Sequence, residues 1–459
     1  MNIPTFRTSR RSFLKGLAVS TGGIILPNIL LAQDGVPASK KLGMACIGVG
    51  GKGESDMTAA AKDNEIVAIC DVDSRTLDKA AAKFPNAKKF TDFRKMLDEV
   101  KEIDAVTIST PDHAHFPAAM HAIALGKHVC VQKPLVNTLW EARELHNAAK
   151  KKGIITQMGN QGHTFEETRV VKEWLQAGVV GKISEIHVWT NRPIWPQGNK
   201  VQLTAGTAPE ALDWQLWLAQ SPDIPYSPEI HPFKWRGFVE YGSGAIGDMG
   251  CHNLDPIFWG LDLGIPTHIE AMTDELTDLA WPRGAKIKYQ WKNVPKHGDI
   301  TMFWYEGKTA DDKPMMPPEL PELEGKEHSK TGFYIRGSEG VLYNGGDQAK
   351  NLQILPEKRS AEFLAAKPEK TLPRSVTPGN PQQEWSLAIK QGKPFPWMSQ
   401  FDYAVPLTEL CLLGALAQRV GKPIQWDSAK LQVVGMPDAA KFIKRASYRA
   451  GWDYSAARI

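Results

Sequence analysis

Gly48-Val49-Gly50-Gly51-Lys52-Gly53 follows an apolar run at residues 42–47 and precedes a second apolar run at 66–70, which ends on Asp71. The order is strand, glycine-rich turn, helix, strand and acidic residue, with the acid about twenty positions beyond the turn. A G-x-G-x-x-G pattern alone is a weak signal, because ordinary turns are also rich in glycine. With every flanking part in place, the pattern predicts a dinucleotide-binding α/β fold.

Each glycine of this turn has its own task in such a fold. Gly48 allows the tight turn, Gly50 lets the backbone approach a pyrophosphate, and Gly53 lets the helix pack close to its strand. The amides that open the helix face the phosphates with the positive end of the helix dipole. Gly51 and Lys52 lie within the turn, so we expect them to contact the same cofactor.

Asp71 is placed to choose between the two nicotinamide dinucleotides. At the end of the second strand, its carboxylate can accept hydrogen bonds from both hydroxyls of an adenosine ribose. The same charge would repel a 2′-phosphate. The sequence therefore favours NAD over NADP.

The composition is that of a globular protein with more than one domain. The chain has 459 residues, too many for one ordinary core, and it is 42% hydrophobic and 23% charged. Its net charge is +4. Four cations that precede the first acidic residue account for this charge; they are Arg7, Arg10, Arg11 and Lys15. The rest of the chain is near neutral, so we expect no nucleic-acid partner.

The first residues have the pattern of a targeting segment. Residues 9–15, Ser-Arg-Arg-Ser-Phe-Leu-Lys, form a twin-arginine motif before a moderately apolar stretch at 16–31. We expect residues 1–32 to be a twin-arginine signal peptide, cleaved near Ala32, that takes the folded protein to the periplasm through the twin-arginine export machinery. The alternative is a fortuitous Arg-Arg pair before an uncleaved anchor.

The cysteines show no disulfide framework. They are scattered, and most fall in apolar runs, where burial as small hydrophobic residues is the simplest interpretation; they are Cys46, Cys70, Cys130, Cys251 and Cys411.

Strands and helices alternate through the first part of the chain, as a parallel sheet requires. We expect residues 41–160 to form an NAD-binding Rossmann domain, a doubly wound parallel sheet. Its later elements are a strand at 104–109, a helix at 117–125, a strand at 128–131, a helix at 139–151 and a strand at 154–158.

Residues 161–459 have a different pattern, which predicts an α+β domain with an open, mostly antiparallel sheet for substrate binding and oligomerisation. Pro-rich stretches at 314–330 and 357–381 are expected to be loops. Strand-like runs occur at 183–190, 268–273, 286–291, 300–305 and 333–336, and helical segments at 166–177, 383–390 and 407–420.

Two strand ends carry polar residues towards the cofactor. In an open parallel sheet the ligand lies beyond the carboxyl ends of the strands. Lys133 leaves its strand before a proline, beside the expected nicotinamide, although a solvated loop lysine is the alternative. The residues expected to contact the cofactor at these ends are Thr110, Pro111, His115, Gln132 and Lys133.

A second group lies at 244–255. If this segment is helical, Asp248 and His252 are four residues apart and project from one face. A carboxylate beside an imidazole raises its basicity, which suits general acid–base catalysis. The alternatives are a surface pair, a buried core histidine, or a metal site that adds Asp255. Without matching Cys/His spacing elsewhere, we predict no metal.

Taken together, these motifs resemble the Gfo/Idh/MocA family of oxidoreductases, the glucose–fructose oxidoreductase and inositol dehydrogenase group. The resemblance covers the chain after its leader: the glycine turn, the strand end at 110–115, the run at 126–134, the Asp248/His252 pair and residues 423–427. It implies a Rossmann domain, a C-terminal α/β domain whose sheet often makes oligomer contacts, and hydride exchange between a sugar or polyol carbon and nicotinamide.

By the same resemblance, Lys133 hydrogen-bonds the reacting oxygen, His252 shuttles its proton, and Asp248 orients His252 and the substrate. One residue departs from the family, which usually has Glu-Lys-Pro where this chain has Gln132-Lys133-Pro134. The loss of that carboxylate changes the charge balance around Lys133.

A tryptophan-rich part of the chain indicates a carbohydrate substrate. Aromatic faces with Arg, Asn and Gln nearby suit a sugar ring, whose C–H faces stack while its hydroxyls form hydrogen bonds. Burial in the core is the alternative for each tryptophan separately. The residues expected to contact substrate are Asn160, His163, Arg192, Trp195, Trp235 and Arg236.

The sequence thus predicts an NAD-dependent oxidoreductase acting on a sugar, polyol or glycoside hydroxyl, with a tightly bound and internally recycled cofactor. An NAD-dependent glycoside hydrolase that works by transient oxidation, elimination and re-reduction is the alternative. A sugar-binding protein without activity fits less well, because the glycine turn, Lys133 and His252 are all present. A homo-oligomer is expected.

Overall fold

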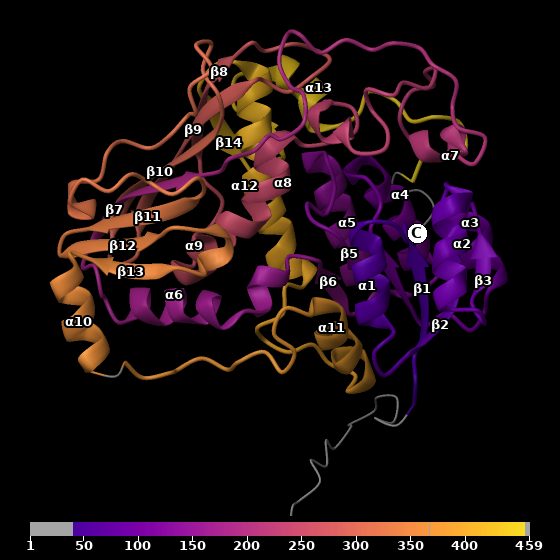
Figure 1. Cartoon of the computed structure of the whole chain (residues 1–459), viewed down its shortest axis with the longest axis horizontal. Helices are drawn as coiled ribbons and strands as arrows, with labels where there is room; N and C mark the ends of the chain where they lie inside the picture. The colour runs from indigo at the N-terminus through magenta and orange to yellow at the C-terminus, as the bar shows by residue number, and fades with distance from the viewer. Residues whose placement is uncertain (1–39, 367, 455–459) are drawn as a thin grey trace, which may run out of the picture.

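The computed structural model describes residues 40–366 and 368–454, and it has two halves, each built on one sheet (Figure 1). The expected signal peptide, residues 1–32, lies outside the described residues.

The first half is a six-stranded parallel sheet in the order β3-β2-β1-β4-β5-β6. The predicted doubly wound fold is therefore confirmed. Its strands are β1 Gly43–Ile47, β2 Glu65–Cys70, β3 Lys88–Phe90, β4 Ala105–Ile108, β5 His128–Val131 and β6 Thr156–Met158. Its helices are α1 Lys52–Ala60, α2 Ser74–Lys83, α3 Phe93–Glu99, α4 Asp112–Ala124 and α5 Leu139–Lys152.

Helix α4 begins five residues before the predicted start at Pro117. A proline inside a helix lacks the N–H that would bond the carbonyl four residues earlier. Here that carbonyl belongs to His113, and it accepts a hydrogen bond of 2.9 Å from Gln220 Nε2 instead. A partner from the second half therefore lets the helix continue through the proline.

The second half is a nine-stranded sheet in the order β13-β12-β11-β7-β10-β9-β8-β14-β15. Only the β7–β10 pair is parallel, so the predicted mostly antiparallel sheet is confirmed. The strands are β7 Ile183–Trp189, β8 His268–Asp274, β9 Gly284–Val294, β10 Gly298–Gly307, β11 Gly332–Gly337, β12 Gly340–Asn344, β13 Leu352–Leu355, β14 Ile424–Asp427 and β15 Gln432–Val433.

The helices of this half are α6 Glu166–Gln176, α7 Trp214–Leu218, α8 Gly244–Asn253, α9 Asp255–Gly260, α10 Glu357–Ala365, α11 Pro381–Lys390, α12 Phe401–Val420 and α13 Ala440–Ile443. Helices α8 and α12 lie between the halves, and α7 and α11 lie beside the first half (Figure 1). Short 3₁₀ helices are η1 Gln161–Thr164, η2 Lys234–Gly237, η3 Pro321–Leu323, η4 Asp347–Ala349 and η5 Pro437–Ala439.

Three predictions about these elements were wrong. Helix α10 lies inside the stretch expected to be a loop, β12 and β13 were not predicted, and α12 begins at Phe401 instead of Leu407. Helix α10 buries no residue, so its sequence carries no apolar stripe to mark it.

Two C-terminal helices join the halves. Helix α12 runs through the centre of the molecule and packs against α5 of the first half and α8 and β8 of the second (Figure 1). Helix α11 lies against α1 and β6, where Trp385 is fully buried and Ile389 nearly so. The core of the first half thus includes side chains from the far end of the chain.

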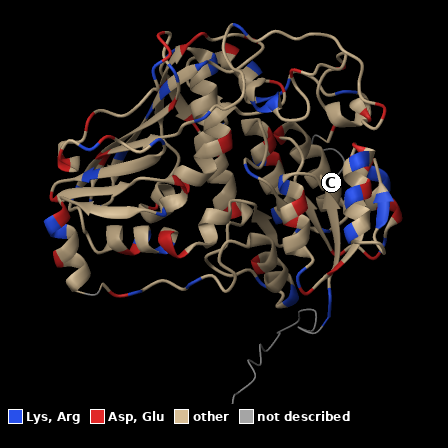
Figure 2. Cartoon of the chain, viewed as in Figure 1, with Lys and Arg blue, Asp and Glu red and all other residues tan. Residues whose placement is uncertain are grey.

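Charges are mixed over both halves, with Lys and Arg beside Asp and Glu on the same elements in the view of Figure 2. Among the helices of residues 40–454 that the structure describes, none is both long and apolar enough to cross a membrane.

Candidate active site

The glycine turn between β1 and α1 is shaped by close backbone contacts. Gly48 has φ +75°, and a Cβ there would lie 2.8 Å from the carbonyl oxygen of Ser109. A Cβ on Gly53 would lie 1.9 Å from the carbonyl oxygen of Gly48. These two positions need glycine for the turn itself and for the close approach of α1, as the sequence predicted.

Asp71 lies directly after β2 and holds the turn in place. Its Oδ2 accepts a hydrogen bond from Val49 N at 2.9 Å, and its Oδ1 accepts one from Asp73 N at 3.0 Å. Burial raises the pKa of the carboxyl above its usual value. A carboxylate has two acceptor sites on each oxygen, so Asp71 retains acceptors that ribose hydroxyls can use.

A cleft of about 1100 Å³ opens between the two halves, starting at the glycine turn. Pockets for one drug-sized ligand are about 300–1000 Å³. This cleft is large enough for a dinucleotide with a smaller ligand beside it. Of the residues predicted from the sequence, it is lined by Gly48, Gly50, Gly51, Lys52, Asp71, Thr110, Pro111, Gln132, Lys133, Trp235, Arg236, Asp248 and His252.

Lys133 and Asp248 form an ion pair at the carboxyl end of β5. Lys133 Nζ donates to Asp248 Oδ1 at 2.9 Å and to the Asp248 carbonyl oxygen at 2.7 Å. Arg236 Nε lies 3.5 Å from the same Oδ1. The side chain of Asp248 is 16% exposed, and these two cations hold the pKa of its carboxyl below the usual value. It is therefore ionised and fixes the position of the lysine ammonium.

His252 lies one turn after Asp248 on α8, so the predicted i, i+4 pair is present. Asp248 raises the pKa of His252, as expected from the sequence, but two larger effects outweigh it. Burial, assisted by the charge of Lys133, lowers the pKa of the imidazole to about 3. Its Nδ1 has no hydrogen-bond partner among the described residues. His252 thus lines the cleft as a neutral imidazole whose Nδ1 is buried.

Asp112 also lines the cleft, and the sequence analysis did not assign it a role. Its Oδ2 accepts a hydrogen bond from Ser243 N at 3.2 Å. Burial raises the pKa of its carboxyl to about 7, although Lys133 and Arg236 act in the opposite direction. Two carboxyl groups therefore share these two cations, and the one on Asp112 titrates near neutrality.

Gln132 is explained by a buried carboxylate that the sequence analysis missed. Asp56, on α1, accepts hydrogen bonds from Gln132 Nε2 at 2.7 Å and Ser109 Oγ at 2.8 Å. It also accepts from Lys52 Nζ at 2.6 Å and Gln382 Nε2 at 2.9 Å. A glutamate at position 132 would place a second carboxylate against the first. An uncharged glutamine at position 132, where the family usually has glutamate, therefore avoids repulsion with the carboxylate of Asp56.

Two of the predicted cofactor residues support the site from behind. Gly53 packs α1 against the turn. His115 is buried, and its two ring nitrogens make hydrogen bonds of 2.9 Å with the carbonyl oxygens of Pro134 and Thr110. The peptide bond between Lys133 and Pro134 is cis. His115 thus connects the two strand ends that carry the site.

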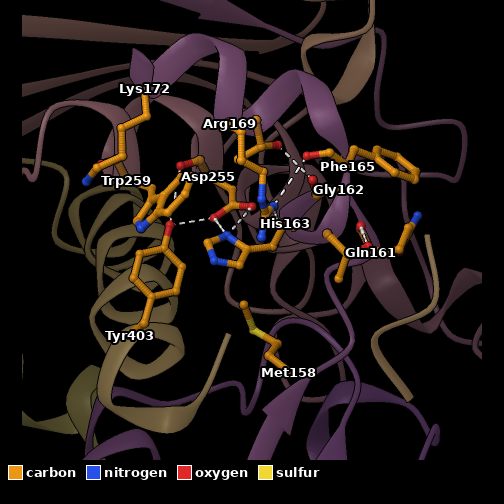
Figure 3. Close-up of polar contacts among 12 residues, drawn as sticks. Met158, Gln161, Gly162, His163, Phe165, Arg169, Lys172, Asp255, Trp259 and Tyr403 are labelled. Atoms are coloured by element: carbon orange, nitrogen blue, oxygen red, sulfur yellow. Dashed lines mark hydrogen bonds and ion pairs between the residues drawn. The ribbon is translucent and has the colours of Figure 1, made fainter. Parts of the chain in front are cut away.

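His163 and Asn160, predicted to bind substrate, do not line the cleft. His163 Nδ1 bonds Asp255 Oδ1 at 2.9 Å, and Tyr403 donates to the same oxygen, so His163 is part of a buried polar cluster (Figure 3). Arg169 in that cluster donates to the carbonyl oxygen of His163. Asn160 is fully buried, and neither atom of its amide has a partner among the residues described.

The remaining substrate candidates lie around one end of the cleft. Trp235 and Arg236 line it, and the guanidinium of Arg236 lies 4.2 Å from the centre of the Trp235 ring. Trp195 is buried behind them and donates to Gln197. Arg192 is not part of the lining; it bonds Asn191.

In the described part of the chain, no three His, Cys, Asp or Glu residues are grouped so that they could hold a metal ion. The five cysteines are buried and free, as the sequence indicated.

Two family models match the chain. One, for the oxidoreductase family with an NAD-binding Rossmann fold, matches residues 42–160. The other, for the C-terminal alpha/beta domain of the same family, matches residues 167–302. The chain belongs to the Gfo/Idh/MocA family of oxidoreductases. Together the two models cover more than half of this family member and contain the glycine turn, Lys133, Asp248 and His252.

Curated relatives in the Gfo/Idh/MocA family match parts of the chain. Levoglucosan dehydrogenase of Pseudarthrobacter phenanthrenivorans is 27% identical over 39% of this chain and 37% of its own length. D-glucoside 3-dehydrogenase of Escherichia coli is 31% identical over 48% of this chain and 66% of its own length. A glycosyl hydrolase family 109 protein of Shewanella sp. MR-4 is 27% identical over 38% of this chain and 44% of its own length. The chain thus matches less than two thirds of each relative.

A solved structure shares the fold. The WlbA dehydrogenase from Bordetella pertussis, in complex with NADH and UDP-GlcNAcA, superposes with a TM-score of 0.58 over 84% of this chain and 99% of that chain. The sequences are 18% identical, so the likeness concerns the fold alone.

The residues present fit a nicotinamide dinucleotide. The glycines of the turn place no Cβ between the backbone and the cleft. Helix α1 begins at this turn, so its N-terminus lies at the cleft. Asp71 has free acceptor positions for the ribose hydroxyls. Lys133 and His252 lie further along the same cleft. One ligand can therefore extend from Asp71 to the ion pair.

Proposed function

We propose that the protein is an NAD-dependent oxidoreductase that acts on a hydroxyl of a sugar, polyol or glycoside by hydride transfer. The observation that carries this proposal is the Lys133–Asp248 ion pair of 2.9 Å, which lies with His252 in the cleft that begins at the glycine turn. Asp71 supports NAD over NADP, because its partly buried carboxylate would repel a 2′-phosphate.

A bound nicotinamide ring supplies the hydride acceptor. The chain's own residues handle the proton and the oxygen. Lys133 Nζ, fixed by two hydrogen bonds to Asp248, is in place to donate to the reacting oxygen and to stabilise charge that develops on it. His252 lines the cleft in its neutral form, which is the form that can accept the hydroxyl proton.

A carbohydrate is supported by the end of the cleft that adjoins the ion pair. Trp235 and half-exposed Phe233 lie at 4.2 and 4.7 Å from the guanidinium of Arg236. Such a group offers apolar faces for C–H groups and donors for hydroxyls. The printed names of two relatives, levoglucosan dehydrogenase and D-glucoside 3-dehydrogenase, agree with this class of substrate.

A second candidate is a glycoside hydrolase that oxidises a ring hydroxyl, eliminates the aglycone and reduces the ring again. The relative named as a glycosyl hydrolase family 109 protein favours it. Both reactions need a proton acceptor and a donor to the oxygen beside the hydride acceptor. Lys133, Asp248 and His252 therefore serve either reaction equally.

The test is a screen of sugars, polyols and glycosides with purified protein, preceded by the absorbance spectrum of its denatured supernatant. NAD in the supernatant and reduction of cofactor by a sugar or glycoside are the expected results. Aglycone release without net redox change would select the hydrolase. No NAD binding and no turnover of any carbohydrate would refute both candidates.

We also propose export to the periplasm by the twin-arginine route, on the motif at residues 9–15. A folded protein that carries its cofactor needs that route. Replacing Arg10 and Arg11 by Lys should hold the protein in the cytoplasm, as measured by cell fractionation. Normal export of that variant would refute the proposal.

A further inference from the structure

One wall of the cofactor cleft comes from the second half of the chain. Residues 209–233, called here the cover, lie between β7 and α8 in sequence. The segment that contains them runs across the top of the molecule to the first half, where α7 lies near α2 (Figure 1). Leu216, Trp217 and Tyr226 of the cover line the same cleft as Asp71.

The cover is joined to the first half directly beyond β2. Ser74 N donates to the carbonyl oxygen of Ala211 at 2.9 Å, and Asp213 N donates to that of Val72 at 2.9 Å. Between them Asp73 and Leu212 form an antiparallel bridge. We call this pairing of 72–74 with 211–213 the latch. It follows Asp71, the residue expected at the adenosine ribose.

The cover has an apolar core of its own. Trp214 and Trp217 stack with ring centres 4.6 Å apart, and both pack in a buried cluster with Leu212 and Tyr241. His113 Nε2 bonds the carbonyl oxygen of Trp217 at 2.9 Å. The cover is therefore a packed unit and not a loose loop.

The C-terminal arm anchors the far side of the cover. Arg449 Nη1 donates to the carbonyl oxygens of Gln215 and Ala219 at 3.0 and 3.1 Å. These bonds attach α7 to the C-terminal residues, in addition to the latch. The cover is thus held by two separate sets of hydrogen bonds.

We propose that the cover is the second wall of the cofactor site and that the latch sets the rate at which the cofactor leaves. Arg75, Thr76 and Lys79 of α2 line the cleft on one side of the expected adenosine position, and the cover lines the other. Release of the adenosine end then requires the 72–74 pairing to open. The inference rests on the proposed nicotinamide cofactor and explains its retention.

Ser74 allows the latch to be tested through one N–H group. It is the first residue of α2, where proline is well tolerated, and Asp73 before it is extended at φ −105° and ψ 110°. Ser74→Pro removes the donor to Ala211 and leaves the helix intact. Ser74→Ala is the matched control, because the exposed hydroxyl is lost in both variants and the N–H only in one.

The measurement is release of NADH from the full-length protein, followed by fluorescence after addition of excess NAD. Ser74→Pro should release NADH about two- to tenfold faster than Ser74→Ala, which should match the wild type. Arg449→Ala should also release NADH faster than the wild type. Hydrogen exchange should show a faster-exchanging Asp213 amide in Ser74→Pro than in the control.

Unchanged release with a faster-exchanging Asp213 amide would overturn the inference, because the cover would then open without affecting the cofactor. Unchanged release and unchanged exchange would overturn the role of the latch. Wild-type protein that binds no NADH would instead overturn the proposed function, and the inference with it.

Discussion

At the residue scale, the two proposed catalytic residues Lys133 and His252 differ in their charge environment. Lys133 is paired with Asp248, whereas His252 is neutral because burial and the lysine lower the pKa of its imidazole to about 3. Lys133→Met and His252→Asn should each leave NAD bound and slow hydride transfer by roughly 10²-fold or more. Single-turnover rates on a confirmed substrate test this, and a wild-type rate in either variant would remove that residue's role.

Gln132 and Asp56 should behave as a coupled pair. Gln132→Glu places two carboxylates together inside the protein and should lower the free energy of unfolding by about 1–3 kcal/mol. Adding Asp56→Asn removes the repulsion, although Lys52 then loses its partner. Urea unfolding of both single variants and the double variant gives the coupling energy, which should favour the double variant by about 1 kcal/mol. Simple additivity would contradict the pairing.

Asp112 makes stability depend on pH. Its pKa is raised to about 7, so between pH 4 and 7 the folded protein binds a proton that the unfolded chain does not. This stabilisation is complete at low pH and is lost as the pH rises through about 7. The free energy of unfolding of the wild type, relative to Asp112→Asn, should therefore fall by about 1–3 kcal/mol from pH 5 to pH 8. Urea unfolding measures it, with exposed Asp438→Asn as control; a flat difference would contradict it.

The proposed catalytic residues could be grouped from the sequence because their spacing is local. Lys133 directly follows a strand, and Asp248 and His252 are one helical turn apart. Asp56 was missed because most of its partners are far away in sequence; Gln382 is 326 positions from it. The substrate candidates His163 and Asn160 follow a strand end, but their side chains are buried in the interior. The local sequence does not show whether a side chain after a strand points into the cleft or into the core.

At the element scale, the doubly wound sheet was predictable because its apolar strands and capped helices follow one another at short range. The errors arose where distant partners decide the structure. Helix α4 continues through Pro117, and Gln220 binds the carbonyl oxygen that the proline leaves free. Strand β13 is one edge of its sheet, β12 is next to it, and both have five residues or fewer.

Gln220 should therefore matter to α4. Its Nε2 also donates to buried Glu141 at 2.8 Å. Gln220→Leu leaves two buried acceptors without that donor and should lower the free energy of unfolding by about 1–3 kcal/mol. Adding Pro117→Ala restores an N–H for the His113 carbonyl and should recover part of the loss. Thermal and urea unfolding test both variants; no recovery in the double variant would contradict this account of the helix.

At the scale of the whole molecule, a retained cofactor implies a redox-neutral cycle. If the protein is exported, released NADH would have no ready replacement, so the bound cofactor should be reduced by one sugar and reoxidised in place. We expect multiple turnovers of the protein without added NAD, either with a donor and an acceptor sugar in ping-pong order or with one glycoside alone. A strict requirement for stoichiometric NAD under both conditions would contradict this cycle.

The position of α11 has a consequence for synthesis of the chain. The core of the first half includes Trp385 and Met398 beside Met44 and Met57, and Trp385 Nε1 donates to the carbonyl oxygen of Ile155 at 3.0 Å. At about 5–20 residues per second, a ribosome needs roughly 10–50 s to travel from β6 to Met398. During that interval the nascent sheet exposes an apolar face to the cytosol and its chaperones. The dinucleotide-binding half is made first and can be completed only near the end of translation.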